Sequence, residues 1–322
     1  MNLNNYQREA QKTDRVPGRK NGQAGVDLVV PLLGLAGETG ELLSEYKKHL
    51  RDGSAHLLFK DRVAEELGDL LWYVANVAAK FDLKLEDIAQ GNLKKTQDRW
   101  GNQDTSSIAF DAEYKEGERF PRQFEIQLSE VVVGGKKKIR AHMNDKQIGE
   151  DLTDNADDPD GYRFHDVFHL GYAAVLGWSP VIRKLLKRKR RSNPQVDEVQ
   201  DGGRAQVIDE AAAALAFDYA KGHNWLKGVT DLDYQLLRTI KGITSLLEVR
   251  ERSMGEWQRA IRLGFDVWRA VLRTGGGRIL VDLDAKDLKY LGPPNKPGTK
   301  CTRPASPASR TALKRTRPSQ DR

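Results

Sequence analysis

The sequence predicts a mainly α-helical protein of 322 residues with three parts: an N-terminal all-α helical bundle, an α-rich second domain with one β-hairpin, and a disordered basic tail. Three observations support this prediction. Apolar residues recur at intervals of three and four over most of the chain, as on helices that bury one face. Residues 123–142 alternate or run apolar around a Gly-Gly pair, which is typical of a hairpin. The last thirty residues are rich in Pro, Ser and Thr and have almost no large apolar side chains.

The N-terminal domain is expected to span residues 1–105 and to contain four helices. A short helix at 4–13 precedes a loop rich in glycine and basic residues. Pro31 fits the first turn of the second helix, where no backbone N–H is required, and Gly53 fits its C-terminal end. The third helix is expected to end before residues 82–85, which separate it from the fourth.

Beyond a polar linker at 106–121, the second domain is expected at 122–292, because a chain of this length normally forms two domains. Its hairpin strands are residues 123–133 and 136–142. Five helices are then expected at Tyr162–Leu176, Pro180–Arg191, Gln206–Lys221, Leu232–Arg252 and Glu256–Arg273.

Two acidic pairs in the N-terminal domain carry the strongest functional signal. Glu38 and Glu41 are spaced i, i+3, as are Glu66 and Asp69, so each pair lies on one face of a helix. Their neighbours are largely apolar, which makes a purely solvated face a poor explanation. Four carboxylates that face one another repel unless a cation lies among them, and oxygen-rich sites suit Mg²⁺ or Mn²⁺.

The segment from about residue 26 to residue 100 resembles the MazG-type all-α nucleoside triphosphate pyrophosphohydrolases. Their Glu-x-x-Glu and Glu-x-x-Asp motifs are matched by Glu38-Thr-Gly-Glu41 and Glu66-Leu-Gly-Asp69, and the flanking Leu-Gly-Leu-Ala-Gly-Glu and Glu-Leu-Gly-Asp-Leu-Leu-Trp-Tyr agree. Thr39 departs from members that double the first glutamate. The second domain resembles the C-terminal portion of longer MazG-like bacterial proteins, and this resemblance implies no activity for it.

The resemblance implies metal-dependent hydrolysis of a nucleoside triphosphate, or of a related nucleotide, between the α and β phosphates to a monophosphate and pyrophosphate. Glu38, Glu41, Glu66 and Asp69 would be the catalytic residues and the ligands of Mg²⁺, or of Mn²⁺, with Glu45 as an additional candidate ligand. The metal allows a highly charged triphosphate to bind among carboxylates. Family members commonly form dimers or tetramers, so a homo-oligomer, at least a homodimer, is expected.

Five further side chains are candidate substrate ligands. Tyr73 and Asn76 continue the face of the second acidic pair and are suited to a base, a sugar or the metal; a core-edge Tyr and an interhelical Asn are the alternative. Asn92, Lys95 and Arg99 form one polar stripe on the next helix at i, i+3, i+7. In similar proteins such a stripe meets the phosphates, and a solvated, salt-bridging face is the alternative.

The second domain contains a candidate metal site of another kind. His165 and His169 are spaced i, i+4, so both imidazoles can reach one transition metal, and Glu210 is a candidate third ligand. The zinc-protease motif is not complete, since Asp166 replaces the glutamate that acts there as general base. Hydrogen bonding within a helical core is the alternative explanation.

The formal charge of +7 first suggests a nucleic-acid partner. Segment 293–322 accounts for all of it, with eight basic residues against one Asp, and its composition predicts a disordered tail. That tail is suited to weak contact with nucleic acid. A second basic run at 183–191 is suited to phosphates or is a charged helix end. The alternative function is therefore a nucleic-acid-associated interaction protein with a vestigial acidic site.

Composition also limits the cellular locations that are expected for the protein. The one cysteine, Cys301, excludes an intrachain disulfide, and no secretory leader or apolar run of ~18 residues is apparent. A cytoplasmic protein without a membrane partner is expected. The base, the sugar, the biological purpose and the role of the second domain are not defined by the sequence.

Overall fold

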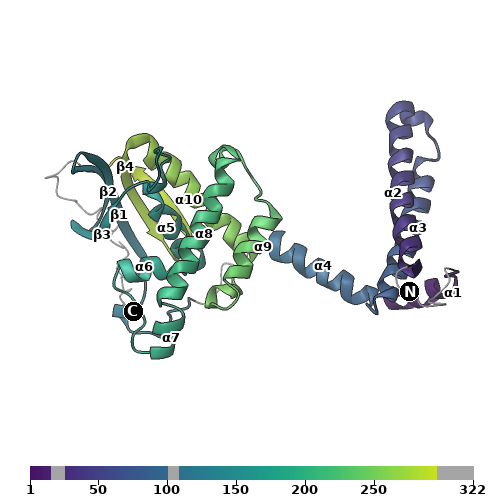
Figure 1. The fold of residues 1–322 in the computed structure, drawn as a ribbon, viewed down its shortest axis with the longest axis horizontal. Coiled ribbons are helices and arrows are strands. Elements are labelled where there is room, and N and C mark those ends of the chain that lie inside the picture. The colour runs from purple at the N-terminus through teal and green to yellow at the C-terminus, as the bar shows by residue number, and fades with distance from the viewer. Residues whose placement is uncertain (16–25, 101–108, 296–322) are drawn as a thin grey trace, which may run out of the picture. The chain divides into compact units, whose positions relative to one another are not determined.

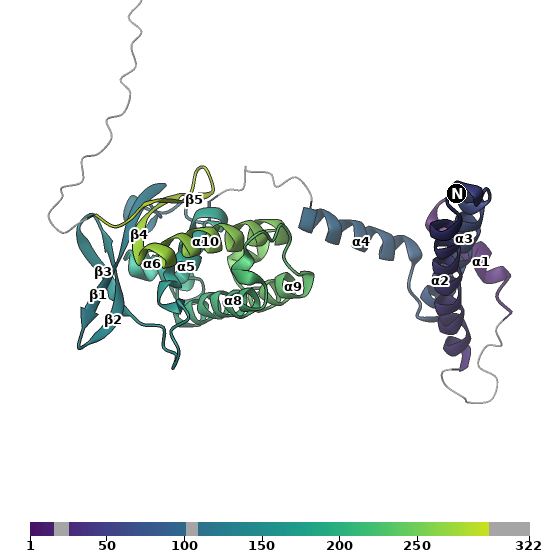
Figure 2. The same cartoon turned by 90° about the horizontal axis from the view of Figure 1, so that it is seen from above.

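The chain divides into two compact units between residues 104 and 105. A computed structural model describes residues 1–15, 26–100 and 109–295, and Figures 1 and 2 give two views of it. The predicted basic tail from residue 296 onward, with Cys301, and residues 106–108 of the predicted linker lie outside the described residues. The two units are presented separately below.

The N-terminal unit is helical. Helices α2 and α3 form an antiparallel pair, α1 packs against α3, and α4 leads away from the pair (Figure 1). The 3₁₀ turn at Gly53–Ala55 follows α2, and Gly53 has φ +56°, so its predicted role as a helix end is confirmed. The helices are α1 (Leu3–Lys12), α2 (Val26–Asp52), α3 (Phe59–Lys80) and α4 (Leu85–Trp100).

The prediction that Pro31 opens the second helix was wrong. Helix α2 begins at Val26, so Pro31 lies inside it and leaves one carbonyl of the preceding turn without its usual partner. Apolar residues 28–30 extend the helical pattern upstream of the proline, which explains the earlier start. The predicted break after α3 is confirmed, since Asp82 takes φ +57° between α3 and α4.

The C-terminal unit contains an antiparallel five-stranded sheet in the order β3-β2-β1-β4-β5. The predicted hairpin is confirmed as β1 and β2, but the sequence did not predict the other three strands. Strand β4 pairs with β1 in a register that joins Ser129 to Gly276, and such a distant pairing leaves no local pattern. The strands are β1 (Gln123–Val133), β2 (Lys136–Met143), β3 (Lys146–Leu152), β4 (Gly276–Asp282) and β5 (Asp287–Gly292).

Helices α5 and α10 pack on the β4–β5 half of this sheet, and α8 and α9 pack outside them (Figure 2). Three predicted helices were too long. The one from Tyr162 starts as a 3₁₀ turn, and α5 begins only at Asp166; the one from Pro180 ends at Leu185; the one from Leu232 begins at Tyr234 and ends at Ile243. The short α7 was not predicted. The helices are α5 (Asp166–Leu176), α6 (Pro180–Leu185), α7 (Pro194–Val199), α8 (Gly203–Lys221), α9 (Tyr234–Ile243) and α10 (Met254–Thr274), with 3₁₀ turns at Glu116–Glu118, Tyr162–Phe164, Asn224–Leu226 and Glu248–Glu251.

The two units differ in how well they bury apolar side chains. In the C-terminal unit, every residue of α5 after Asp166 is buried, and the side chains of Trp178, Trp257 and Trp268 are among the largest that are fully buried. The apolar neighbours of the acidic pairs on α2 and α3 are less buried in the single chain: Leu33 and Leu67 are 66% and 51% exposed. A single N-terminal unit therefore leaves much apolar surface uncovered.

Helices α5 and α10 lie close together at Gly171, where a Cβ would be 2.8 Å from the carbonyl oxygen of Ala260. We expect Gly171→Ala to lower the free energy of unfolding by roughly 1–3 kcal/mol, because the added methyl overpacks backbone rather than a movable side chain. Gly242→Ala in α9 is the control: a Cβ added there would have no neighbour within 4 Å in the described part of the chain, and alanine favours a helix. Urea unfolding followed by tryptophan fluorescence measures both, and equal midpoints would contradict the prediction.

Candidate functional site

Helices α2 and α3 bring three of the four predicted acidic residues together. Carboxylate oxygens of Glu38, Glu66 and Asp69 lie within 4.8 Å of one another. Glu38 and Glu66 are half-buried and Asp69 is exposed, so the group opens to solvent at the side of Asp69. The i, i+3 spacing of Glu66 and Asp69 places both on the face of α3 that meets α2.

The carboxylates of this group interact electrostatically. The pKa of Glu66 is raised, first by burial and then by the charge of Glu38 and a hydrogen bond to it. Glu41 also raises the pKa of Glu66, so it lies near the group although its oxygens are not among the three that converge. Carboxylates this close share either a proton or a cation. A donor set made only of carboxylate oxygens fits a hard divalent ion such as Mg²⁺ or Mn²⁺.

Glu45, the additional candidate ligand, has other partners. It is 7% exposed and forms an ion pair with Lys48, and one of its oxygens lies 3.1 Å from Nε2 of His56. The hydrogen bond from Lys48 is the main reason that the pKa of Glu45 is lowered, although burial opposes it. Glu45 is therefore held as a carboxylate in an ion pair and is not among the converging oxygens.

Two tyrosines border the acidic group. The ring of Tyr73 packs against α2 at Gly34, where a Cβ would lie 2.2 Å from its Cε1 atom, one turn before Glu38. Tyr6 on α1 was not predicted: its pKa is raised by burial and by the charge of Asp69, which places it near the group. No motif in α1 indicates this, because the contact depends on how α1 packs against α3.

Asn76 takes the interhelical role that the sequence also allowed. It is fully buried; its Oδ1 accepts from Nε2 of Gln11 at 2.8 Å, and its Nδ2 donates to the carbonyl oxygen of Trp72 at 3.2 Å. The bond from Gln11 joins α1 to α3, and the bond to Trp72 lies within α3. Asn76 therefore contributes to the support of the site rather than to its surface.

The polar stripe of α4 is not brought to the acidic group within one chain. The backbone N–H of Leu85 donates to Oε1 of Gln7 at 2.9 Å, which attaches the start of α4 to α1. From there α4 runs away from the α2–α3 pair (Figure 1). Asn92 and Lys95 are exposed and Arg99 is half-buried on this helix.

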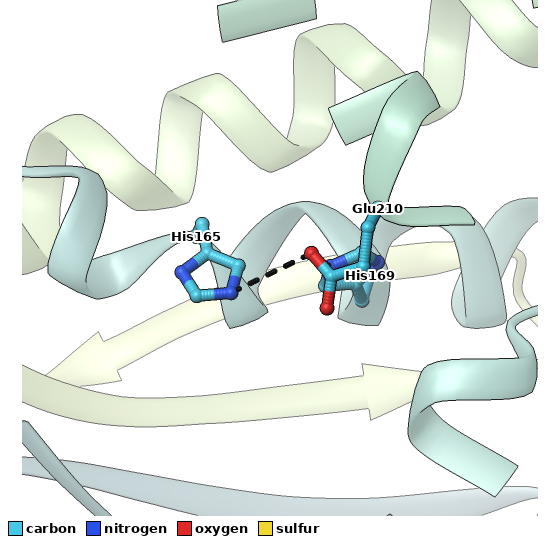
Figure 3. Close-up of side chains that lie close together, drawn as sticks. All are labelled: His165, His169 and Glu210. Atoms are coloured by element: carbon cyan, nitrogen blue, oxygen red, sulfur yellow. Dashed lines mark hydrogen bonds and ion pairs between the residues drawn. The ribbon is translucent and has the colours of Figure 1, made fainter. Parts of the chain in front are cut away.

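The C-terminal unit joins the three residues of the second candidate metal site (Figure 3). His165 immediately precedes α5, His169 lies one turn further, and Glu210 comes from α8. Oε2 of Glu210 lies 3.2 Å from Nε2 of His169 and 3.8 Å from Nε2 of His165. One ligand atom from each residue lies within 4.8 Å of the other two.

A buried carboxylate that was not predicted from the sequence orients His169. Asp209 is fully buried; its Oδ1 lies 2.7 Å from Nδ1 of His169, and its Oδ2 accepts from Oγ of Ser179 and from the backbone N–H of Val181. Burial lowers the pKa of His169, but Asp209 and Glu210 outweigh it and raise the value to about 10. Without a metal, the imidazole is therefore a cation held between two carboxylates.

The basic run at 183–191 was considered as a phosphate-binding segment or a charged helix end, and two of its seven basic side chains are buried. Arg183 and Arg190 are each 1% exposed. Nη2 of Arg183 lies 2.9 Å from Oδ2 of Asp111, and Nη2 of Arg190 lies 2.7 Å from Oδ1 of Asp201. These two arginines are structural ion-pair partners, and their charges are already neutralised inside the unit.

Comparisons with known proteins agree with the two-unit organisation. Residues 31–102 match the model of the MazG nucleotide pyrophosphohydrolase domain, and residues 105–294 match that of the MazG C-terminal domain. The chain is 37% identical over 101 residues to the Gene 37 protein of Mycobacterium phage L5, across 31% of this chain and 89% of that protein. No solved structure matches the chain. None of the helices in the described parts of the chain combines the length and apolar character of a membrane span.

Proposed function

Because the chain belongs to the MazG family of nucleotide pyrophosphohydrolases, we propose that it hydrolyses a nucleoside triphosphate, or a related nucleotide, between the α and β phosphates. The products are a monophosphate and pyrophosphate. The observation that carries this proposal is the convergence of Glu38, Glu66 and Asp69 from two helices, with Glu41 nearby. A nucleotide substrate also favours a cytoplasmic location.

The residues of the acidic group are assigned two roles, metal binding and activation of water, according to their positions. Glu38, Glu66 and Asp69 would hold Mg²⁺, or Mn²⁺, and Glu41 is suited to orient or deprotonate the attacking water. A divalent ion bound there neutralises phosphate charge and lowers the pKa of a bound water. Tyr73 and Tyr6 border the group and offer aromatic surface to a base or a sugar.

The test uses the full-length chain and distinguishes cleavage between the α and β phosphates from cleavage between the β and γ phosphates. Each NTP and dNTP is incubated with Mg²⁺ or Mn²⁺, and both pyrophosphate and the nucleotide product are measured. We expect monophosphate with an equal amount of pyrophosphate, and no turnover in excess EDTA. Diphosphate with inorganic phosphate would contradict the proposal. Absence of turnover on every nucleotide, together with salt-sensitive nucleic-acid binding, would favour the interaction-protein alternative.

We also propose that the active form is a homo-oligomer, at least a dimer. Leu32, Leu43 and Leu50 fall within about 20° of one line along α2, yet they are 48%, 63% and 68% exposed. A stripe this apolar is typical of an interface. A second copy would cover it, and the stripe of Asn92, Lys95 and Arg99 on α4 is suited to meet phosphates in such an assembly.

We expect Leu43→Glu to convert the oligomer into a monomer at micromolar concentration, because a buried carboxylate at the interface would have no partner. The rate of nucleotide hydrolysis should fall because the oligomer is lost. Light scattering after size-exclusion chromatography measures the mass, and Leu246→Glu is the control, since Leu246 is 67% exposed in the C-terminal unit. An unchanged mass for Leu43→Glu would show that this stripe is not the interface.

A further inference from the structure

Two imidazoles in the C-terminal unit present the same nitrogen to one carboxylate. Nε2 of His169 and Nε2 of His165 lie 3.2 Å and 3.8 Å from Oε2 of Glu210 (Figure 3). Ligands that bind a tetrahedral zinc ion at ~2.0–2.1 Å lie about 3.3 Å from one another. Small side-chain movements are therefore enough to place a metal ion among these three atoms.

The opposite nitrogen of each ring has a fixed acceptor. Nδ1 of His165 lies 2.9 Å from the carbonyl oxygen of Tyr162, and Nδ1 of His169 lies 2.7 Å from Oδ1 of Asp209. A carbonyl oxygen accepts only from a protonated nitrogen, so the neutral His165 ring carries its proton on Nδ1. Asp209 favours the same tautomer of His169. When both rings are neutral, as metal binding requires, the two Nε2 lone pairs face the site, which is the arrangement of metal-binding histidines with an outer carboxylate or carbonyl.

The supporting residues are themselves held in place. Asp209 accepts from Oγ of Ser179 at 2.6 Å and from the backbone N–H of Val181 at 3.1 Å. The ring of Tyr162 stacks on His165 with centroids 4.6 Å apart and an interplanar angle of 7°. These contacts hold both imidazole rings in fixed orientations.

His165 is not explained by hydrogen bonding alone. The residue is 8% exposed, yet its Nε2 lies 3.8 Å from both Oε2 of Glu210 and Oδ1 of Asp166, too far for a hydrogen bond. A ring nitrogen of a buried residue that lies 3.8 Å from two carboxylate oxygens, without a hydrogen bond to either, leaves room for a cation. Glu210 is 44% exposed at its side chain, so an ion can enter from solvent.

We propose that His165, His169 and Glu210 bind one divalent transition-metal ion, with Zn²⁺ as the preferred ion, in the C-terminal unit. Two imidazoles and one carboxylate favour zinc over Mg²⁺, whereas the acidic group of the N-terminal unit offers only oxygen. Asp209 binds Nδ1 of His169, on the side of the ring opposite the ion, and does not contact the ion. The exposed side of Glu210 leaves a fourth coordination position open to water or to a small ligand.

The test uses the full-length chain with Glu38→Gln and Asp69→Asn, so that the acidic group does not contribute. Titration with Co²⁺ at neutral pH is followed by visible absorption, and Zn²⁺ affinity is measured by competition with a chromophoric chelator. We expect one equivalent of Co²⁺ with the intense bands of a low-coordinate site, and its displacement by Zn²⁺. Glu210→Gln and His165→Asn should each weaken Zn²⁺ binding by at least ~10- to 100-fold.

Two matched variants control for loss of charge or of an imidazole elsewhere. Asp218→Asn removes an exposed carboxylate from the same helix as Glu210, and His223→Asn removes an exposed histidine. Both should bind Zn²⁺ with unchanged affinity, and circular dichroism verifies that all variants are folded. The proposal is overturned if no Zn²⁺ equivalent binds, or if Glu210→Gln binds it as tightly as Asp218→Asn does. In that case the three residues are a hydrogen-bonded network only.

Discussion

Replacing Glu66 with Gln is expected to lower nucleotide hydrolysis by about 100-fold or more, whereas Glu65→Gln should stay within about twofold of the unaltered chain. The two glutamates are neighbours on α3 and differ in what they face. Glu66 lies within 4.8 Å of Glu38 and Asp69, while Glu65 is exposed and pairs with Arg62 at 2.7 Å. Only Glu66→Gln removes a charge that a bound cation requires.

The measurement is the rate of pyrophosphate release at saturating nucleotide over a range of Mg²⁺ concentrations. If Glu66 binds the metal, part of the loss in Glu66→Gln should be recovered at high Mg²⁺, because weaker binding is offset by concentration. Circular dichroism shows whether both variants retain their helices. Equal rates for the two variants would remove Glu66 from the site, and equal losses would indicate a general effect of charge on α3.

Local spacing explains why the acidic group could be predicted. Glu66 and Asp69 are one helical turn apart, so their common face follows from the sequence once α3 is known to be a helix. The same holds for His165 and His169 on α5. The order of the sheet could not be predicted in this way, because helices α5 to α10 separate β1 from β4 in the sequence and no local spacing indicates that these strands pair.

Residues that act from outside a motif escaped prediction because their roles depend on packing. Asp209 and Glu210 are adjacent on α8 and point ~100° apart, and the sequence does not indicate which of them is buried. The structure buries Asp209 completely and leaves Glu210 at the rim. Tyr6 lies near Asp69 for the same reason, through the contact of α1 with α3.

The basic run shows the limit of composition. Its charges suggested a phosphate-binding surface, but an arginine that is buried in an ion pair cannot bind a phosphate from solvent. Arg190 pairs with Asp201 and Glu248, which come from other parts of the chain, and no spacing within the run indicates either partner. Two arginines of a dense basic run can therefore lie inside a domain, because their carboxylate partners come from elsewhere in the chain.

Arg190→Leu is expected to lower the free energy of unfolding of the C-terminal unit by about 3–5 kcal/mol, whereas Arg191→Leu should change it by less than about 0.5 kcal/mol. Arg190 is 1% exposed and donates to both carboxylate oxygens of Asp201 and of Glu248, at 2.7–3.1 Å. These bonds raise the pKa of Arg190 even though burial alone would lower it. Its loss leaves the fully buried Asp201 with less compensating charge.

Arg191 is the matched control because it is adjacent in sequence and exposed. Arg190→Lys provides an intermediate case that keeps the prediction testable if Arg190→Leu does not fold: an ammonium retains the charge but cannot form both two-pronged pairs. Urea unfolding followed by tryptophan fluorescence should show Arg191→Leu as the most stable of the three variants, Arg190→Lys as intermediate and Arg190→Leu as the least stable. An Arg190→Leu midpoint equal to that of Arg191→Leu would mean that this buried ion-pair network does not stabilise the unit. Because Arg190 lies in the C-terminal unit and the acidic group in the N-terminal one, any loss of hydrolysis in a folded Arg190→Lys protein would in turn reveal energetic coupling between the two units.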